Sequence, residues 1–193
     1  MRNAPTGSGL VVIGASLGGL AALPVVLCNL PAAFPLPIVV VQHRSAVSGF
    51  SALASVLQRG CPLALAEAYD KEPLRGGRVY LAPADYHTLI DDDHLALSTE
   101  ARVQYARPSI DVLFHSAAEG FGARTIAVVM TGANRDGVRG ARAIKQRGGV
   151  VLVQDPATAE SPVLPSAALS SVAVDRVVPL VELAAMLVHY GLR

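Results

Sequence analysis

Short hydrophobic runs alternate with helical patterns along most of the chain. Apolar runs that stop at glycine or polar residues are typical of buried strands, and they cover residues 10–14, 37–41, 124–130 and 149–153. Weaker strand-like runs cover 63–67 and 172–174. Helices are expected at 17–30, 48–59, 108–120, 138–147, 165–170 and 178–190. Strands that alternate with helices predict a parallel sheet joined by right-handed crossovers.

The segment 70–100 has a different pattern. Its strand-like runs at 78–82, 86–90 and 94–98 are short and are separated by turn-forming residues, which predicts a β-hairpin excursion. We interpret the acidic run 91–93 as a solvated turn and not as a metal site. The expected fold class is therefore α/β: a doubly wound, mostly parallel sheet (Rossmann-like or flavodoxin-like) flanked by helices, with an antiparallel β-hairpin near one edge. A single domain is expected over 1–193, with a core at about 9–190.

Composition and charge narrow the class of protein. Hydrophobic residues make up 52% of the 193 residues and aromatic residues only 5%, which suits a parallel sheet between alanine-rich helices. A net charge of +1 gives no reason to expect a nucleic-acid partner. No apolar run approaches the ~20 residues of a membrane span, and no targeting segment is evident, so we expect a soluble, cytoplasmic protein. In that reducing setting we expect Cys28 and Cys61 to be two small side chains, buried or half-buried, and we do not expect a disulfide framework.

The segment from Gly14 to Gly19 matches the Gly-x-Ser-x-Gly spacing of a nucleophile elbow. Such a turn exposes the serine, here Ser16, between a strand and a helix N-terminus, where peptide dipoles favour negative charge. The same letters also suit a phosphate-binding loop or a plain turn. A dinucleotide site requires an acidic residue about twenty positions downstream, at the end of the second strand. The residues 41–44 contain no carboxylate, which disfavours the nucleotide hypothesis.

A serine nucleophile needs a base, and His43 follows the second buried strand directly. The other histidines are placed less well: His115 is expected to pack against the sheet, His87 to be solvated in the hairpin, and His94 and His189 to lie in a turn and in the last helix.

Asp136 lies in a glycine-bearing loop after the strand 124–130, where it either caps the next helix or orients the base. Ser16, His43 and Asp136 thus each follow a different buried strand, at the sheet edge where α/β proteins build their sites. Together they predict a catalytic triad in the order Ser–His–Asp, which differs from the order in α/β-hydrolases.

Five ordered motifs resemble one known family, the catalytic domain of CheB, the protein-glutamate methylesterase of bacterial chemotaxis. They cover residues 13–19, 41–43, 79–87, 107–114 and 131–137. The resemblance implies hydrolysis of glutamyl methyl esters, and deamidation of particular glutamines, on the cytoplasmic helices of methyl-accepting chemotaxis receptors. It implies that Ser16 is the nucleophile, His43 the general base and then acid, and Asp136 the carboxylate that orients His43. It also implies oxyanion donors at the backbone amides of His43 and Ala133, with no cofactor and no metal.

The chain departs from the family pattern at the rim of the site. It has Leu17 where Thr or Ala is common, Ala133 where Met is usual, and Asn134-Arg135 in place of a Gly-Asn pair. The family's N-terminal receiver domain has no counterpart in this sequence, so we expect a free-standing relative or an excised domain whose regulatory partner is unknown.

Three arginines lie near Asp136 in the sequence: Arg135, Arg139 and Arg142. They either attract the acidic helices of the receptors or form an ordinary solvated helix face. Three rival functions stay open: a triad esterase or amidase with another substrate, a catalytically weak receptor-binding relative, and a nucleotide-binding protein.

Overall fold

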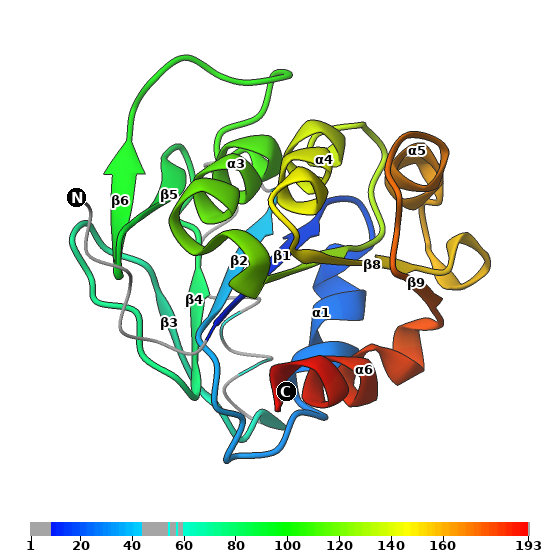
Figure 1. Ribbon diagram of the computed structural model, residues 1–193, viewed down its shortest axis with the longest axis horizontal. Coiled ribbons are helices and arrows are strands. Elements are labelled where there is room, and N and C mark those ends of the chain that lie inside the picture. Colours follow the sequence, from blue (N-terminus) through cyan, green and yellow to red (C-terminus); the bar gives the residue numbers. More distant parts are fainter. Residues whose placement is uncertain (1–8, 44–53, 55–56, 58–59, 193) are drawn as a thin grey trace.

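A central parallel sheet organises the structure, a computed structural model that describes residues 9–43, 54, 57 and 60–192. Within these residues the sheet has seven strands in the order β3-β4-β2-β1-β7-β8-β9, and every neighbouring pair is parallel. The strands are β1 (Leu10–Ala15), β2 (Ile38–Gln42), β3 (Ala64–Glu67), β4 (Arg78–Leu81), β7 (Thr125–Val129), β8 (Val150–Gln154) and β9 (Arg176–Val178). The chain winds from the central β1 toward β2 and later returns through β7 on its other side, which is the doubly wound arrangement that the sequence predicts (Figure 1).

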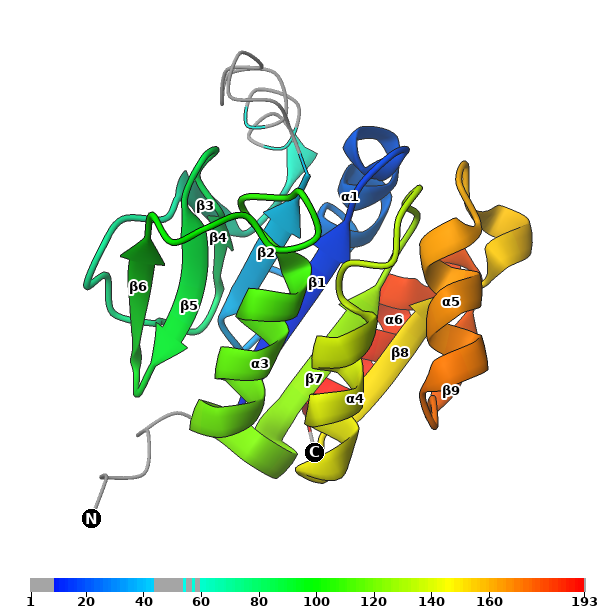
Figure 2. The same ribbon diagram turned by 90° about the horizontal axis from the view of Figure 1, so that it is seen from above.

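Helices cover both faces of the sheet (Figure 2). One face carries α3 (Ile110–Phe121), α4 (Val138–Gln146) and α5 (Val163–Ser171), and the other carries α1 (Gly19–Leu27) and α6 (Leu183–Gly191). Alternate side chains of β1 therefore enter two separate hydrophobic clusters: Val12 packs with the α3 side and Ile13 with the α1 side, both fully buried. This double burial explains why the strands appear in the sequence as continuous apolar runs. Among the described residues, no helix has both the length and the apolar character needed to cross a bilayer.

The predicted antiparallel hairpin is present as β5 (His87–Asp91) and β6 (His94–Ser98), a two-stranded sheet separate from the main one. It packs against α3, where the Ile90 amide donates to Ser116 Oγ at 3.0 Å. The prediction was wrong for the run 78–82, because this segment is β4 and lies between β2 and β3 in the main sheet.

The last predicted strand, at 172–174, was also wrong. The helix α5 ends at Ser171 with Val172 as its C-terminal cap, and the strand β9 begins only after Asp175. The Asp175 carboxylate accepts hydrogen bonds from the Val151 amide at 2.7 Å and from Lys145 Nζ at 2.8 Å. These bonds attach the chain to β8 and to α4 just before the pairing of β9 begins. The predicted helix 48–59 lies mostly outside the described residues, and its described members, Ala54 and Leu57, are helical and buried.

The expectation of two unbonded cysteines was wrong, because Cys28 and Cys61 form a disulfide. Cys28 is the C-terminal cap of α1, and the two half-buried cysteines meet beside the cluster on the α1 face. The two residues are 33 positions apart, so their proximity depends on the tertiary fold and not on any local pattern.

The contact between α3 and α4 gives a test of the fold. A Cβ atom added at Gly140 would lie 2.4 Å from Phe114 Cβ and 3.0 Å from the Asp111 carbonyl oxygen. We expect Gly140→Ala to lower the free energy of unfolding by about 1–3 kcal/mol through overpacking. Gly120→Ala is the matched control, because the nearest atom to its Cβ would be Ile90 Cγ2 at 3.4 Å. It should be neutral or stabilise α3 by up to about 1 kcal/mol. Urea unfolding measures both, and equal effects would contradict this close helix contact.

Candidate active site

Three adjacent strands deliver polar side chains to one edge of the sheet. β1 lies between β2 and β7, and Ser16, His43 and Asp136 follow these three strands at their carboxyl ends. Backbone hydrogen bonds hold the strand ends in register: the Ser16 amide donates to the Thr131 carbonyl at 2.9 Å, and the His43 amide donates to the Ala15 carbonyl at 3.0 Å. The edge is the one where α/β proteins bind ligands.

The three side chains form one hydrogen-bonded row. His43 Nδ1 lies 3.2 Å from Ser16 Oγ, and His43 Nε2 lies 2.7 Å from Asp136 Oδ2. An ionised carboxylate can only accept, so Nε2 carries the proton and Nδ1 presents its lone pair to the serine hydroxyl. The imidazole is 13% exposed and Asp136 is fully buried, so the carboxylate end of the row is closed to solvent.

Asp136 is held by the N-terminus of α3 as well as by His43. Its carboxylate accepts hydrogen bonds from the Ile110 amide at 2.7 Å, from Ser109 Oγ at 2.8 Å and from the Asp111 amide at 3.0 Å. Burial by itself raises the pKa of a carboxyl group. Here the hydrogen bonds from His43, Asp111, Ser109 and Ile110 outweigh burial and hold the pKa of Asp136 below its ordinary value. The site therefore keeps a buried negative charge next to the imidazole.

Asp111 makes the reciprocal contact and was missed from the sequence. From the first turn of α3 its carboxylate accepts the Gly137 and Gly140 amides of the α4 N-terminus, each at 2.9 Å. It also accepts Gln104 Nε2 at 2.8 Å. Burial raises the pKa of Asp111, and the nearby Asp136 charge raises it further. Each of the two helix starts is thus capped by a carboxylate from the other segment. The sequence signal for this exchange is the position of Asp111 in the first turn of a predicted helix.

Gln42 links the two halves of the site and was also missed. Its Nε2 donates to the Ser16 carbonyl at 2.8 Å and to the His43 carbonyl at 2.9 Å, so one side chain fixes both backbones. The sequence signal is a polar residue that ends an otherwise apolar buried strand. The serine turn itself passes through Gly18, whose φ of +85° is a conformation that side-chain-bearing residues rarely adopt.

The two residues whose amides are expected to bind the oxyanion differ in hydrogen bonding and exposure. The His43 backbone amide is engaged with the Ala15 carbonyl, so in this structure it continues the sheet. Ala133 is exposed in the loop that also carries Asp136. In the glycine loop, the Gly19 amide donates to the Ser16 carbonyl at 2.9 Å and closes the turn locally. Among the described residues, no group of three His, Cys, Asp or Glu side chains is placed to hold a metal ion.

Two expectations about the other histidines were wrong. His87 is buried, not solvated: its Nδ1 accepts the Ser109 amide at 3.2 Å, and its Nε2 donates to the Ala101 carbonyl at 3.1 Å. It therefore supports the residue whose hydroxyl reaches Asp136. His115 is exposed on α3 and does not pack against the sheet.

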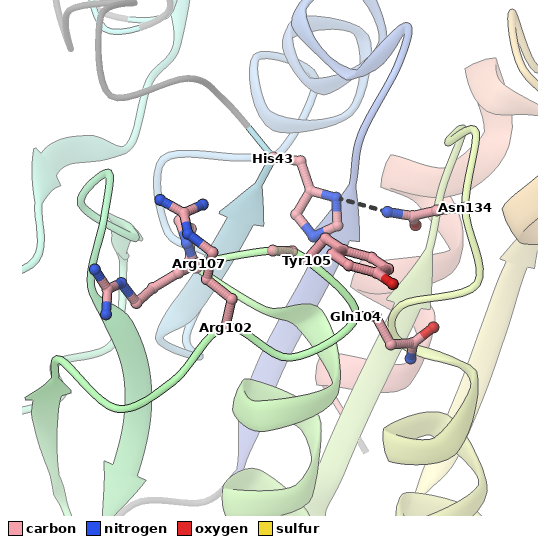
Figure 3. A pocket seen from close by; sticks show the side chains of 8 residues that line it. His43, Arg102, Gln104, Tyr105, Arg107 and Asn134 are labelled. Carbon is pink, nitrogen blue, oxygen red and sulfur yellow. Dashed lines mark hydrogen bonds between the residues drawn. The ribbon is translucent and has the colours of Figure 1, made fainter.

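A cavity of about 330 Å³ opens beside His43 (Figure 3). Its wall comes from the β7–α4 loop at Asn134 and from the loop before α3; the lining residues of that second loop are Arg102, Gln104, Tyr105, Ala106, Arg107 and Pro108. Arg102 and Arg107 both contact the Asp85 carboxylate, at 2.9 and 3.0 Å, so one negative charge faces two positive ones. Tyr105 is almost fully exposed at the rim.

The three arginines near Asp136 do not line this cavity. Arg135, before α4, and Arg139 and Arg142, on α4, are all exposed. Arg139 lines a different cavity with Asp111 and Glu119, and Arg142 donates to the Ser171 carbonyl at 3.2 Å.

Comparison with known proteins gives one consistent result. The model of the CheB methylesterase family matches residues 11–187. The crystal structure of the Thermotoga maritima CheB methylesterase catalytic domain superposes with a TM-score of 0.90 at 34% identity, and the match covers 95% of this chain and 99% of that one.

Two relatives illustrate the range of chain lengths. A protein of Anaeromyxobacter dehalogenans named protein-glutamate methylesterase/protein-glutamine glutaminase 2 is 46% identical over 90% of this chain, which spans 51% of that protein. A protein of Leptospira interrogans, provisionally named for the same two activities, is 42% identical over 93% of both chains.

The buried Asp136 charge gives a pH-dependent test. Unfolded aspartate titrates near about pH 3.9. Because the folded pKa of Asp136 lies lower, its charge stabilises the fold fully above that pH, and the stabilisation disappears as pH falls through the folded value. Asp136→Asn should lower the free energy of unfolding by about 3 kcal/mol at pH 7, because the amide cannot accept from all of these donors.

Urea unfolding of wild type and variant between pH 7 and pH 3 measures the effect. We expect the gap between the two proteins to narrow as the pH falls below about 4, because the carboxyl group then binds a proton more readily in unfolded than in folded wild type. Asp92→Asn, at an exposed turn, is the control, and its free energy of unfolding should equal that of wild type at each pH. A gap that stays constant over this range would contradict a stabilising buried charge.

Proposed function

The chain belongs to the CheB methylesterase family, and from this premise we propose that it hydrolyses methyl esters of glutamate side chains on methyl-accepting chemotaxis receptors. The observation that carries the proposal is the row Ser16–His43–Asp136, with the hydroxyl of the half-buried Ser16 at one end and a buried carboxylate at the other. This is the arrangement that activates an alcohol as a nucleophile.

In the first half of the reaction, Ser16 Oγ attacks the ester carbonyl carbon while its proton moves to His43 Nδ1. Asp136 stabilises the imidazolium that forms, because its charge lies 2.7 Å from Nε2. Collapse of the tetrahedral intermediate breaks the bond to the methoxy group, and His43 returns the proton so that methanol leaves. The product of this half is a glutamyl ester of Ser16.

In the second half, water takes the place of the alcohol. His43 removes a proton from water, hydroxide attacks the acyl-enzyme, and Ser16 recovers its proton as the glutamate side chain is released. A glutamine side chain follows the same path with ammonia as the leaving group, which corresponds to the second activity in the relatives' names. Neither half requires a cofactor.

The oxyanion that forms during each half needs hydrogen-bond donors. We assign one of them to the Ala133 backbone amide, in the exposed loop before Asp136. The family pattern assigns another to the His43 amide, which in this structure donates to Ala15; using it would require the end of β2 to separate from β1.

The rim of the cavity suits an acidic protein segment. Among the described residues, Asp85 supplies the one carboxylate paired with Arg102 and Arg107, and Tyr105 offers an exposed aromatic ring beside them. Arginine and tyrosine are the residue types that anchor protein interfaces. We propose that this rim contacts the cytoplasmic helices of the receptors around the esterified glutamate.

The proposed substrate also locates the protein in the cytoplasm. The disulfide between Cys28 and Cys61 is unusual for that compartment, where thiols are normally kept reduced. It lies at the C-terminal end of α1, whereas Ser16 precedes the N-terminal end of the same helix, so the catalytic row does not depend on it directly.

Release of methanol from methyl-labelled receptor membranes tests this function. We expect the wild-type protein to release volatile label, and Ser16→Ala to lower the rate by roughly 10⁴–10⁶-fold, because the nucleophile is lost. Ser170→Ala, which removes an exposed hydroxyl on α5, is the matched control and should release label like wild type. Equal release by wild type and Ser16→Ala would contradict the triad. Hydrolysis of small esters without release from receptors would contradict the proposed substrate.

A further inference from the structure

Asn134 touches the atom that receives the proton. Its Nδ2 lies 3.3 Å from His43 Nδ1 (Figure 3). The same nitrogen lies 3.2 Å from Ser16 Oγ. Asn134 comes from the β7–α4 loop and forms part of the wall of the cavity beside His43. The sequence shows it only as a departure from the family pattern, at a position where glycine is usual.

The orientation of this carboxamide follows from its other contact. Asn134 Oδ1 accepts the Asp136 amide at 3.2 Å. With the oxygen engaged there, the NH₂ group is directed at the imidazole. Nδ1 has a single lone pair in the tautomer that Asp136 imposes, so Asn134 and Ser16 both donate to one acceptor in the resting enzyme.

This shared acceptor disappears during the reaction. When the Ser16 proton moves to Nδ1, that nitrogen becomes a donor, and an N–H of Asn134 then faces another N–H. At the same moment the Ser16 Oγ–carbon bond forms and the carbonyl electron pair moves onto the substrate oxygen. A strong new acceptor is thus created beside Ser16 just as the Asn134 amide loses its resting partner.

We infer that Asn134 is a catalytic residue of this chain, whose Nδ2 donates to the substrate oxyanion. The inference rests on the proposed function, since it needs a tetrahedral intermediate on Ser16. It is supported by the His43 backbone amide, which is occupied by the Ala15 carbonyl and leaves the site short of a donor. An interaction that is made to substrate only after attack lowers the barrier without tightening ground-state binding.

Steady-state hydrolysis of p-nitrophenyl acetate tests the inference, because an activated small ester needs the oxyanion donors but no receptor. We expect Asn134→Ala to lower kcat by roughly 10²–10³-fold at the plateau of the pH–rate profile, with KM little changed. Asn134→Asp keeps the shape but has no N–H, and its kcat should fall at least as far. Asn29→Ala, at an exposed asparagine beyond the opposite end of α1, is the matched control and should retain wild-type kcat.

The alternative role predicts a different result. If Asn134 only competes with Ser16 for Nδ1, its removal leaves the plateau kcat unchanged or raises it, and moves only the midpoint of the acidic limb; that result overturns the inference. An active wild type, an inactive Ser16→Ala and a fully active Asn134→Ala would leave the proposed function intact and remove this inference alone. A wild type that releases neither nitrophenol nor methanol would overturn both.

Discussion

The burial of one ionised carboxylate, Asp136, is the constraint on which the arrangement of the site depends. A charge with no exposed surface is tolerated only when donors surround it, and here they come from His43 and from the first turn of α3. Those α3 amides have no partner within their own helix, so Asp136 satisfies them while they neutralise it. Asp111 does the same for α4. Each helix start is thereby fixed by a side chain from the other segment, which joins α3, α4 and the end of β7 into one unit.

This unit determines what the imidazole can do. Because the only atoms of Asp136 that face His43 are acceptors, the proton is held on Nε2, and the lone pair on Nδ1 points to Ser16. Gln42 then sets the distance between the two backbones from behind, with one NH₂ group on both carbonyls. In the proposed mechanism, orientation of the base therefore requires no movement when substrate arrives, and preorganisation of this kind would contribute to catalysis because it is completed during folding.

The sequence predicts those features that a single strand or loop determines. Buried runs followed by Ser16, His43 and Asp136 identified the parallel sheet and three residues that meet at one of its edges, because the carboxyl ends of parallel strands coincide. Local sequence patterns do not predict contacts between segments that are far apart in the chain. The exchange of caps by Asp111 and Asp136, the disulfide of Cys28 with Cys61, and the burial of His87 all depend on which loops the tertiary fold brings together. Residue type alone suggested a solvated histidine and two thiols, and both expectations failed.

Most backbone donors of the site already have hydrogen-bond partners within the protein, and this limits the donors that a substrate oxyanion can use. The Ser16 and His43 amides donate to neighbouring strands, and the Asp136 amide donates to Asn134. Any donor that the oxyanion uses must therefore be exposed, as the loop at Ala133 is, or be released by the chemistry itself. In the proposed mechanism, proton transfer to Nδ1 would release one donor, the carboxamide of Asn134, in the step that creates the negative charge. A chain with an asparagine at this position can thus couple formation of the imidazolium to stabilisation of the oxyanion, which a glycine cannot do.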